Sequence, residues 1–269
     1  MADPLNIPDT PPHSSGAAFF DIDRTLVAGA AALRPAGSFR RQGLLTRRQQ
    51  VRAAITQLAF AVRGADDDGI ERFKATAKEL IAGWDQQEVR DIVARELDRH
   101  VHPIVYREAL DRIELHHSQG QSVFAVSATM REIAEPLADL LGLDGTVATE
   151  MEIVDGMFTG DVKIGCFGAT KAEQLVAFAA ERGIDLAAST AYSDSISDEP
   201  FLRSVGRPYA VNPDKELRKL AEEEGWGILA FRTRVQIPLH QRKSTRISAV
   251  VALFSAVMFS RSRRRRRAG

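Results

Sequence analysis

The stretch that decides the fold is FFDIDRTL at residues 19–26, where an apolar run leads into two carboxylates and then a threonine. Residues 17–22 are short, apolar and rich in strand formers, so they predict a buried strand of a parallel sheet. Ligands of open α/β sheets bind at the carboxyl ends of such strands. The adjacent carboxylates of Asp21 and Asp23 would repel each other without a cation between them, which favours a hard metal such as Mg²⁺. An acidic loop after a strand is the alternative for this pair taken alone.

Three further segments follow in order, each at a plausible place in such a sheet. Residues 123–129 (VFAVSAT) predict a second apolar strand that ends in hydroxyls, and residues 168–171 (GATK) open a helix with a lysine in its first turn. Residues 191–198 (AYSDSISD) predict a strand end with two acids four positions apart. Four motifs in register are far more specific than any one alone. Together they resemble the haloacid dehalogenase superfamily of phosphohydrolases, and within it subfamily IB, the branch similar to phosphoserine phosphatases.

The resemblance implies a role for each motif acid. Asp21 attacks phosphorus to form an aspartyl-phosphate, while Asp23 protonates the leaving alcohol and then activates the hydrolytic water. Mg²⁺ would be held by Asp21, by the backbone carbonyl of Asp23 and by Asp194. Asp198 would orient a water on the metal. N-capping of a helix that begins near Ser197 is the alternative role for Asp194 and Asp198.

Two further positions can bind the phosphoryl group. Ser127 ends a buried strand, where its hydroxyl and the backbone N–H of Ala128 can bind phosphoryl oxygens, as the resemblance implies for the second motif. Lys171 lies beside the positive end of a helix dipole, so an anion is expected next to it. The resemblance makes Lys171 both a phosphate-binding and a catalytic residue. An ordinary surface lysine is the alternative.

The sequence departs from the phosphoserine phosphatase pattern in two places. Residues 28–32 (AGAAA) carry no charge where that family has an acid for the amino group of its substrate. Residues 193–198 (SDSISD) lack the glycines and asparagine that are more usual in the last motif. These changes are compatible with the reaction and weigh against an amino-acid substrate.

The expected fold class is α/β, with a Rossmann-like parallel sheet and an inserted helical cap. After the second motif the chain alternates between strand and helix patterns, which is typical of a parallel sheet. Helices are expected at residues 131–141 and 169–182, and a short strand at residues 146–150. About a hundred residues of helical pattern separate the first two motifs, too many for a simple crossover. We therefore expect a core from residues 17–31 and 106–235, a cap at residues 32–105, and a leader at residues 1–16 without apolar periodicity.

Local patterns make further predictions. A capping-box-like pair at residues 85 and 88 predicts a helix start, and Asp-Gly at residues 155–156 predicts a tight hairpin. Pro103 is expected to begin a helix that leads into the second strand. His116 and His117 lie on this helix, away from every motif, and are expected at the surface.

Composition indicates a globular protein with an unequal distribution of charge. The chain has 269 residues, 44% of them apolar, and a formal charge of zero. Six of its 36 basic side chains are arginines in residues 261–269, which leaves 30 basic and 36 acidic side chains, a net of −6, before that segment. Its one cysteine, Cys166, excludes an internal disulfide and is expected to be a small buried hydrophobe. With no signal peptide at the front, the catalytic part is expected in a reducing cytosol.

Residues 242–269 form a tail with an apolar run, residues 247–259, between basic flanks. The run would cover about 20 Å of a roughly 30 Å hydrocarbon core. We expect it to lie in the cytoplasmic leaflet, with a short transmembrane anchor as the alternative. In the cap, residues 34–63 contain seven arginines and no acid, which favours a solvated face and leaves open a surface for anionic substrate or lipid.

The leading hypothesis is therefore a Mg²⁺-dependent phosphomonoesterase, associated with the cytoplasmic membrane surface by its tail. Its substrate would be a small or lipid phosphomonoester, and no nucleic-acid motif appears. Two other functions stay open. One is transfer of the phosphoryl group to an acceptor other than water. The other is a catalytically silent, membrane-bound binding protein, against which the intact motif residues argue.

Overall fold

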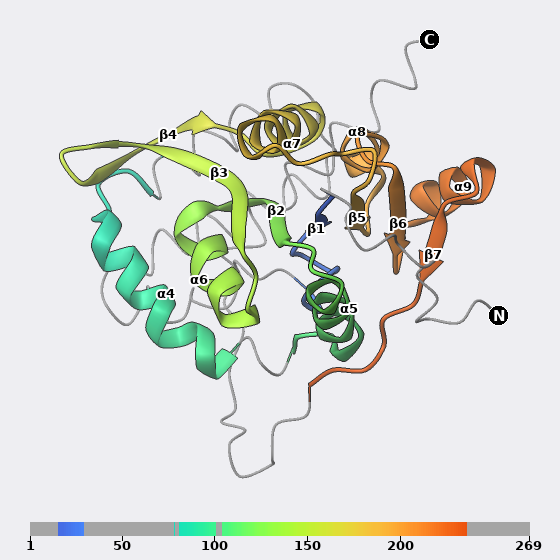
Figure 1. The fold of residues 1–269 in the computed structure, drawn as a ribbon. Coiled ribbons are helices and arrows are strands. Elements are labelled where there is room, and N and C mark those ends of the chain that lie inside the picture. Colours follow the sequence, from blue (N-terminus) through green and yellow to red (C-terminus); the bar gives the residue numbers. More distant parts are fainter. Residues whose placement is uncertain (1–15, 30–77, 79–80, 101–103, 236–269) are drawn as a thin grey trace.

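A seven-stranded sheet forms the centre of the described part of the chain (Figure 1). The computed structural model describes residues 16–29, 78, 81–100 and 104–235. The strands are β1 (Ala18–Phe20), β2 (Val123–Met130), β3 (Gly145–Val154), β4 (Met157–Ile164), β5 (Thr190–Ser193), β6 (Arg207–Val211) and β7 (Gly227–Leu229).

The strand order is β4-β3-β2-β1-β5-β6-β7, so the first strand of the chain lies in the middle of the sheet. Each neighbouring pair is parallel except β3 and β4, which form an antiparallel hairpin at one edge. The predicted α/β fold with a Rossmann-like parallel sheet is confirmed. Because β1 lies between β2 and β5, the carboxyl ends of three motif-bearing strands meet at one place.

Helices cover both faces of the sheet, and the side chains of β1 alternate between two apolar cores. Phe20 packs into a core shared with α4, α5 and α6, whereas Phe19 packs into a core shared with α7, α8 and α9. This double burial explains why the strand reads as a continuous apolar run. The helices are α4 (Gln86–His100), α5 (Arg107–Ser118), α6 (Arg131–Leu141), α7 (Ala169–Arg182), α8 (Glu199–Arg203) and α9 (Lys215–Glu224), with a 3₁₀ turn η3 (Ile196–Asp198) before α8.

The chain turns sharply where β1 ends, and the turn places the first motif. The strand is shorter than the predicted 17–22, although the N–H of Asp21 still donates to the carbonyl of Tyr192 at 2.9 Å. Beyond it, the N–H groups of Leu26 and Val27 both donate to the carbonyl of Ile22, at 3.0 and 3.1 Å. The acids therefore lie in a closed turn at the carboxyl end of the sheet.

Several local predictions are confirmed. Helices α6 and α7 have the bounds expected from their patterns. Asp155 and Gly156 have φ values of 51° and 79°, which both central residues of a type I′ hairpin turn require. The N–H of Glu88 donates to Asp85 Oδ1 at 2.7 Å and caps the start of α4.

Helix α5 begins at Arg107 rather than at the predicted Pro103. The residues just before it are occupied in extended contacts, because Tyr106 donates its N–H to Leu26 and Val105 bridges to Val27. These contacts tie the start of α5 to the turn after β1.

The predicted cap lies mostly outside the described residues, as do the leader, the arginine-rich segment and the tail at residues 242–269. The part of the predicted cap that is described includes α4, which packs against α6. Just before α4, the Trp84 carbonyl accepts from the N–H of Phe158 in β4, and the N–H of Gly83 donates to the Phe158 carbonyl. The cap boundary stays a prediction. No helix within the described ranges is both long and apolar enough to cross a bilayer.

The prediction that His116 lies at the surface is wrong. This residue of α5 is 1% exposed, and its ring lies between the Gln121 amide and the Tyr192 hydroxyl. Nδ1 is 2.7 Å from Gln121 Oε1, and Nε2 is 2.8 Å from Tyr192 Oη. Burial is the main cause that lowers the pKa of His116, to about 4. His117 is exposed as predicted and lies 3.0 Å from Asp144.

Candidate active site

The structure brings the four sequence motifs together at the carboxyl edge of the sheet. Asp21 follows β1, Ser127 lies near the end of β2, and Asp194 follows β5. Lys171 enters from the first turn of α7, which packs against β2. The site is therefore built from segments about 175 residues apart in the chain that neighbouring parallel strands bring side by side.

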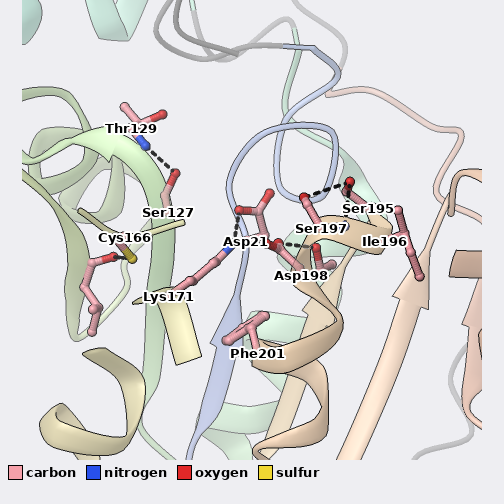
Figure 2. A network of polar contacts seen from close by, with 12 residues as sticks. Asp21, Ser127, Thr129, Cys166, Lys171, Ser195, Ile196, Ser197, Asp198 and Phe201 are labelled. Atoms are coloured by element: carbon pink, nitrogen blue, oxygen red, sulfur yellow. Dashed lines mark hydrogen bonds and ion pairs between the residues drawn. The ribbon is translucent and has the colours of Figure 1, made fainter. Parts of the chain in front are cut away.

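Lys171 is the cation at the buried end of this site. Its Nζ is 2.6 Å from Asp21 Oδ1 and 2.6 Å from Asp198 Oδ2, and only 1% of the residue is exposed (Figure 2). The ring of Phe201 lies beside the ammonium, 4.9 Å from Nζ to the ring centre. The surface-lysine alternative is therefore wrong. Although burial opposes the charge, Asp198 and Asp21 raise the pKa of Lys171 above its ordinary value, so the group stays protonated.

Asp198 is the second carboxylate that contacts Lys171. Its Oδ2 also accepts a hydrogen bond from Ser193 Oγ at 2.6 Å, which fixes the carboxylate. Asp198 precedes α8 but makes no side-chain capping bond to that helix. The capping alternative is thus wrong for Asp198, whose visible role is to position Lys171.

Burial makes Asp21 harder to ionise in this structure. Burial is the main reason that the pKa of Asp21 is raised to about 7. The positive charge of Lys171 opposes this shift, and the negative charges of Asp198 and Asp23 add to it. With a pKa of about 7 the carboxyl is only partly ionised at neutral pH, and a further cation beside it would favour the ionised form.

Asp194 is also harder to ionise than an exposed carboxyl group. Burial and the charge of Asp21 raise the pKa of Asp194 to about 8, while Arg24 opposes the shift. Arg24 Nε lies 3.5 Å from Asp194 Oδ2. The capping alternative is also wrong for Asp194, because the side chain that caps η3 is Ser195, which accepts from the N–H of Ser197.

The donors at this edge fit a small divalent cation. The charge of Asp21 acts on Asp194 directly, so two buried carboxylates repel each other where a cation would relieve both. Within the described residues, no group of three His, Cys, Asp or Glu side chains could hold a metal. A cation would thus be held by two carboxylates, with backbone carbonyl and water oxygens completing its coordination. This oxygen-only set, with few carboxylates, suits Mg²⁺.

Ser127 and Cys166 line the side of the site formed by β2 and β3. Ser127 is buried, and its Oγ accepts from the N–H of Thr129 at 3.1 Å, just where the pairing of β2 with β3 shifts register. Ala128, the next residue, is half-buried. Cys166 is buried as predicted, and burial raises the pKa of its thiol to about 12, so it remains a neutral thiol.

Sequence reasoning missed three residues around the site: Arg24, Ser193 and Phe201. Arg24 and Ser193 lie inside the quoted motifs, next to an acid, so their positions were visible but their contacts were not. Phe201 lies three residues after the last acid, on α8, where an apolar residue is ordinarily read as core. Only the structure shows that its ring faces Lys171.

The fold places a buried lysine and several carboxyl groups at one edge of the sheet, and comparison with known proteins identifies the family. A family model for haloacid dehalogenase-like hydrolases matches residues 18–203, and the chain belongs to this family. The expected resemblance is thereby confirmed.

Relatives agree with this assignment. The chain is 46% identical over 222 residues to the inhibition of morphological differentiation protein of Streptomyces azureus, covering 82% of this chain and 80% of that one. It is 40% identical over 251 residues to a probable phosphatase of Mycobacterium tuberculosis, covering 93% and 87%. A phosphoserine phosphatase solved as a phospho-aspartyl intermediate analogue has the same fold, with a TM-score of 0.54, 20% identity, and coverage of 82% and 95%. The protein is a phosphoserine phosphatase-like phosphoric monoester hydrolase.

Proposed function

We propose that this phosphatase is Mg²⁺-dependent and works through an aspartyl-phosphate on Asp21. The observation that carries the proposal is the buried Lys171, whose Nζ lies 2.6 Å from both Asp21 and Asp198. Beside it lies Asp194, whose pKa is raised to about 8. Such a site stabilises an anion that forms next to Asp21, which is what phosphoryl transfer requires.

Each chemical step then has a residue. A carboxylate oxygen of Asp21 forms a bond to phosphorus while the bond from phosphorus to the alcohol oxygen breaks, and protonated Asp23 gives its proton to that oxygen. In the second step Asp23 takes a proton from water, the water oxygen bonds to phosphorus, and the bond to Asp21 breaks. Inorganic phosphate leaves, and both carboxyl groups return to their starting forms. Asp23 is half-buried, which keeps it within reach of solvent water.

Charge on the phosphoryl oxygens is offset at the buried end. Lys171 supplies a fixed positive charge, while the Ser127 hydroxyl and the Ala128 N–H supply hydrogen bonds from the neighbouring strand. Mg²⁺, held by Asp21, the Asp23 carbonyl and Asp194, would add positive charge and keep the two raised carboxyl groups ionised. Asp198 positions Lys171.

The substrate is proposed to be a small or lipid phosphomonoester. The uncharged residues 28–32, which weigh against an amino-acid substrate, support this choice. The basic and apolar tail at residues 242–269 supports a place at an anionic, cytoplasmic membrane surface, where each basic side chain contributes about 1 kcal/mol. This part of the proposal rests on the sequence.

The mechanism is tested by trapping the intermediate. Wild-type protein is mixed with p-nitrophenyl phosphate and Mg²⁺, quenched in acid and digested, and the peptide that contains Asp21 is weighed. We expect one added phosphoryl group on this peptide and none in the Asp21→Asn variant. Activity should be lost in a chelator and restored by Mg²⁺. Full activity after exhaustive chelation, or a phosphoryl group on another residue, would contradict the proposal.

Membrane association is tested separately. The full chain and a variant lacking residues 242–269 are sedimented with phosphatidylglycerol vesicles and, as control, phosphatidylcholine vesicles. We expect only the full chain to sediment, only with the anionic vesicles, while both hydrolyse soluble esters. A truncated protein that still sediments would rule out the tail as the anchor.

A further inference from the structure

Arg24 has a position in the site that the proposed chemistry does not use. It follows Asp23 directly and has φ 66°, in the left-handed region that residues other than glycine seldom adopt. Its N–H donates to the carbonyl of Gly29 at 3.3 Å, so the turn after β1 holds it in this conformation. A non-glycine residue kept in such a conformation beside a nucleophile invites a functional explanation.

The side chain of Arg24 lies on the open side of the site. Its side chain is 58% exposed, whereas the side chain of its partner Asp194 is 7% exposed. At 3.5 Å from Nε to Oδ2, and with one partner so exposed, this ion pair is weak and easily exchanged. Lys171 is the opposite case, because it is buried and held by two contacts of 2.6 Å. The site therefore has a fixed cation at its closed end and an adjustable one at its open end.

In-line geometry decides which part of a substrate would meet Arg24. The attacking and leaving oxygens lie on opposite sides of phosphorus, so an alcohol displaced by Asp21 extends away from it. The buried end beyond Asp21 is filled by Lys171 and Phe201. The leaving alcohol must then extend toward the open side, where the Arg24 guanidinium lies. A cation bound to Asp194 would also compete with Arg24 for that carboxylate and release the guanidinium.

We propose that Arg24 determines specificity by binding an anionic group, a carboxylate or a second phosphate, on the leaving alcohol of the substrate. This inference rests on the proposed function. The planar guanidinium matches two oxygens of either group at once. Residues 25–29 of the same turn are Thr, Leu, Val, Ala and Gly, so Arg24 is followed by no other charged residue in this turn.

The test compares esters whose leaving alcohols differ in charge. Wild-type protein with Mg²⁺ is assayed on 3-phosphoglycerate, glycerol 3-phosphate and phosphoethanolamine, whose alcohols are anionic, neutral and cationic. We expect wild type to prefer 3-phosphoglycerate, and Arg24→Gln to lose this preference by about tenfold or more, mainly through KM. Arg24→Lys should keep most of the preference because it keeps the charge. Arg218→Gln, which changes an exposed arginine of α9, is the matched control.

Two further measurements keep the test decisive. If Arg24→Gln does not fold, as judged by its melting curve, Arg24→Asn replaces it, because asparagine accepts the left-handed conformation. Mg²⁺ binding to each variant is measured by calorimetry. An equal loss on all three esters together with altered Mg²⁺ affinity would overturn the inference and make Arg24 a positioning residue for the metal. An active wild type whose charge preference is unchanged in Arg24→Gln, or in the Arg24→Asn that replaces it, overturns it as well. A wild type inactive on every phosphomonoester would overturn the proposed function itself.

Discussion

Two buried polar clusters lie next to each other along β1 and β5, and they differ in whether their buried titratable groups need added positive charge. Phe20 and Tyr192 belong to the cluster around His116, while Asp21 and Asp194, one and two residues further on, belong to the active site. In the first cluster both ring nitrogens of His116 have neutral partners, and burial lowers the pKa of the ring to about 4. In the second, burial raises the pKa values of Asp21 and Asp194 to about 7 and about 8.

The balance of buried charge distinguishes a structural cluster from a functional one even when no ligand is bound. A buried histidine whose two ring nitrogens both have neutral partners needs no added charge and contributes to stability, even with the buried Arg112 guanidinium nearby. A cluster with more buried carboxylates than cations is costly on its own and becomes favourable only when positive charge or a ligand is added. Changes in the active-site cluster should therefore act on turnover, and changes in the histidine cluster on stability.

Replacing the nucleophile should have the largest effect. Asp21→Asn keeps the shape of the side chain but removes the group that bonds to phosphorus, so turnover should fall by roughly 10⁴-fold or more. Steady-state phosphate release measures the loss. Circular dichroism and the melting curve should show an intact fold, since the amide relieves carboxylate repulsion. Asp111→Asn, an exposed change on α5, is the control. Wild-type turnover in the Asp21 variant would refute the assigned role.

Asp23→Asn should be the next most damaging change. Loss of the proton donor should cost about 10²- to 10⁴-fold in turnover of alkyl esters. An aryl ester such as p-nitrophenyl phosphate should lose much less, because its leaving oxygen needs no proton. Comparing the two substrate types in the same variant separates acid catalysis from general damage. Equal losses would mean that Asp23 is not the acid.

Removing the buried cation tests the charge balance directly. Lys171→Met should lower turnover by about 10²- to 10³-fold, the usual cost of losing a preorganised charge-stabilising group. The matched control is Lys215→Met, because Lys215 also lies in the first turn of a helix but is exposed. A Lys171 variant as active as the control would show that the buried ion pairs are structural, like the histidine cluster.

Much of the fold could be predicted from the sequence where local signals and tertiary packing agree. Helices α6 and α7 have their predicted bounds because each ends at a glycine, Gly142 or Gly183, in the left-handed conformation that stops a helix. Strand β3 runs beyond its predicted end at residue 150, to Val154, because the edge strand β4 pairs with it there. The last three residues of β3 are partly or fully exposed, so the apolar pattern of a buried strand stops before them.

The site could be predicted as a set of residues but not as a set of contacts. Motif spacing identifies Asp21, Lys171 and Asp198, yet their contacts depend on β1 lying between β2 and β5, an order that no single segment encodes. His116 shows the same limit. It lies on the helix face of the buried residues Ala109 and Ile113, which was the available signal. Its partners come from a distant strand and a loop.

The smallest effect is expected in the histidine cluster, and it should appear in stability rather than turnover. Unfolded His116 takes up a proton near pH 6.5, whereas the folded residue stays neutral until about pH 4. Acidification between these values therefore favours the unfolded state and lowers the free energy of unfolding by up to about 3 kcal/mol. His116→Gln removes this titration, so the loss of stability between pH 7 and pH 4.5 should be smaller than in wild type. Urea unfolding at both pH values measures it.

The control for this last change is the adjacent exposed residue. His117→Gln should keep the wild-type difference between the two pH values, since it leaves the contacts of His116 untouched. At pH 7 the His116 variant should retain turnover within about twofold once folded, because the ring nitrogens contact Gln121 and Tyr192 rather than the motif acids. A large loss of turnover with unchanged stability would break the comparison, because it would place the histidine cluster among the groups that act on the substrate.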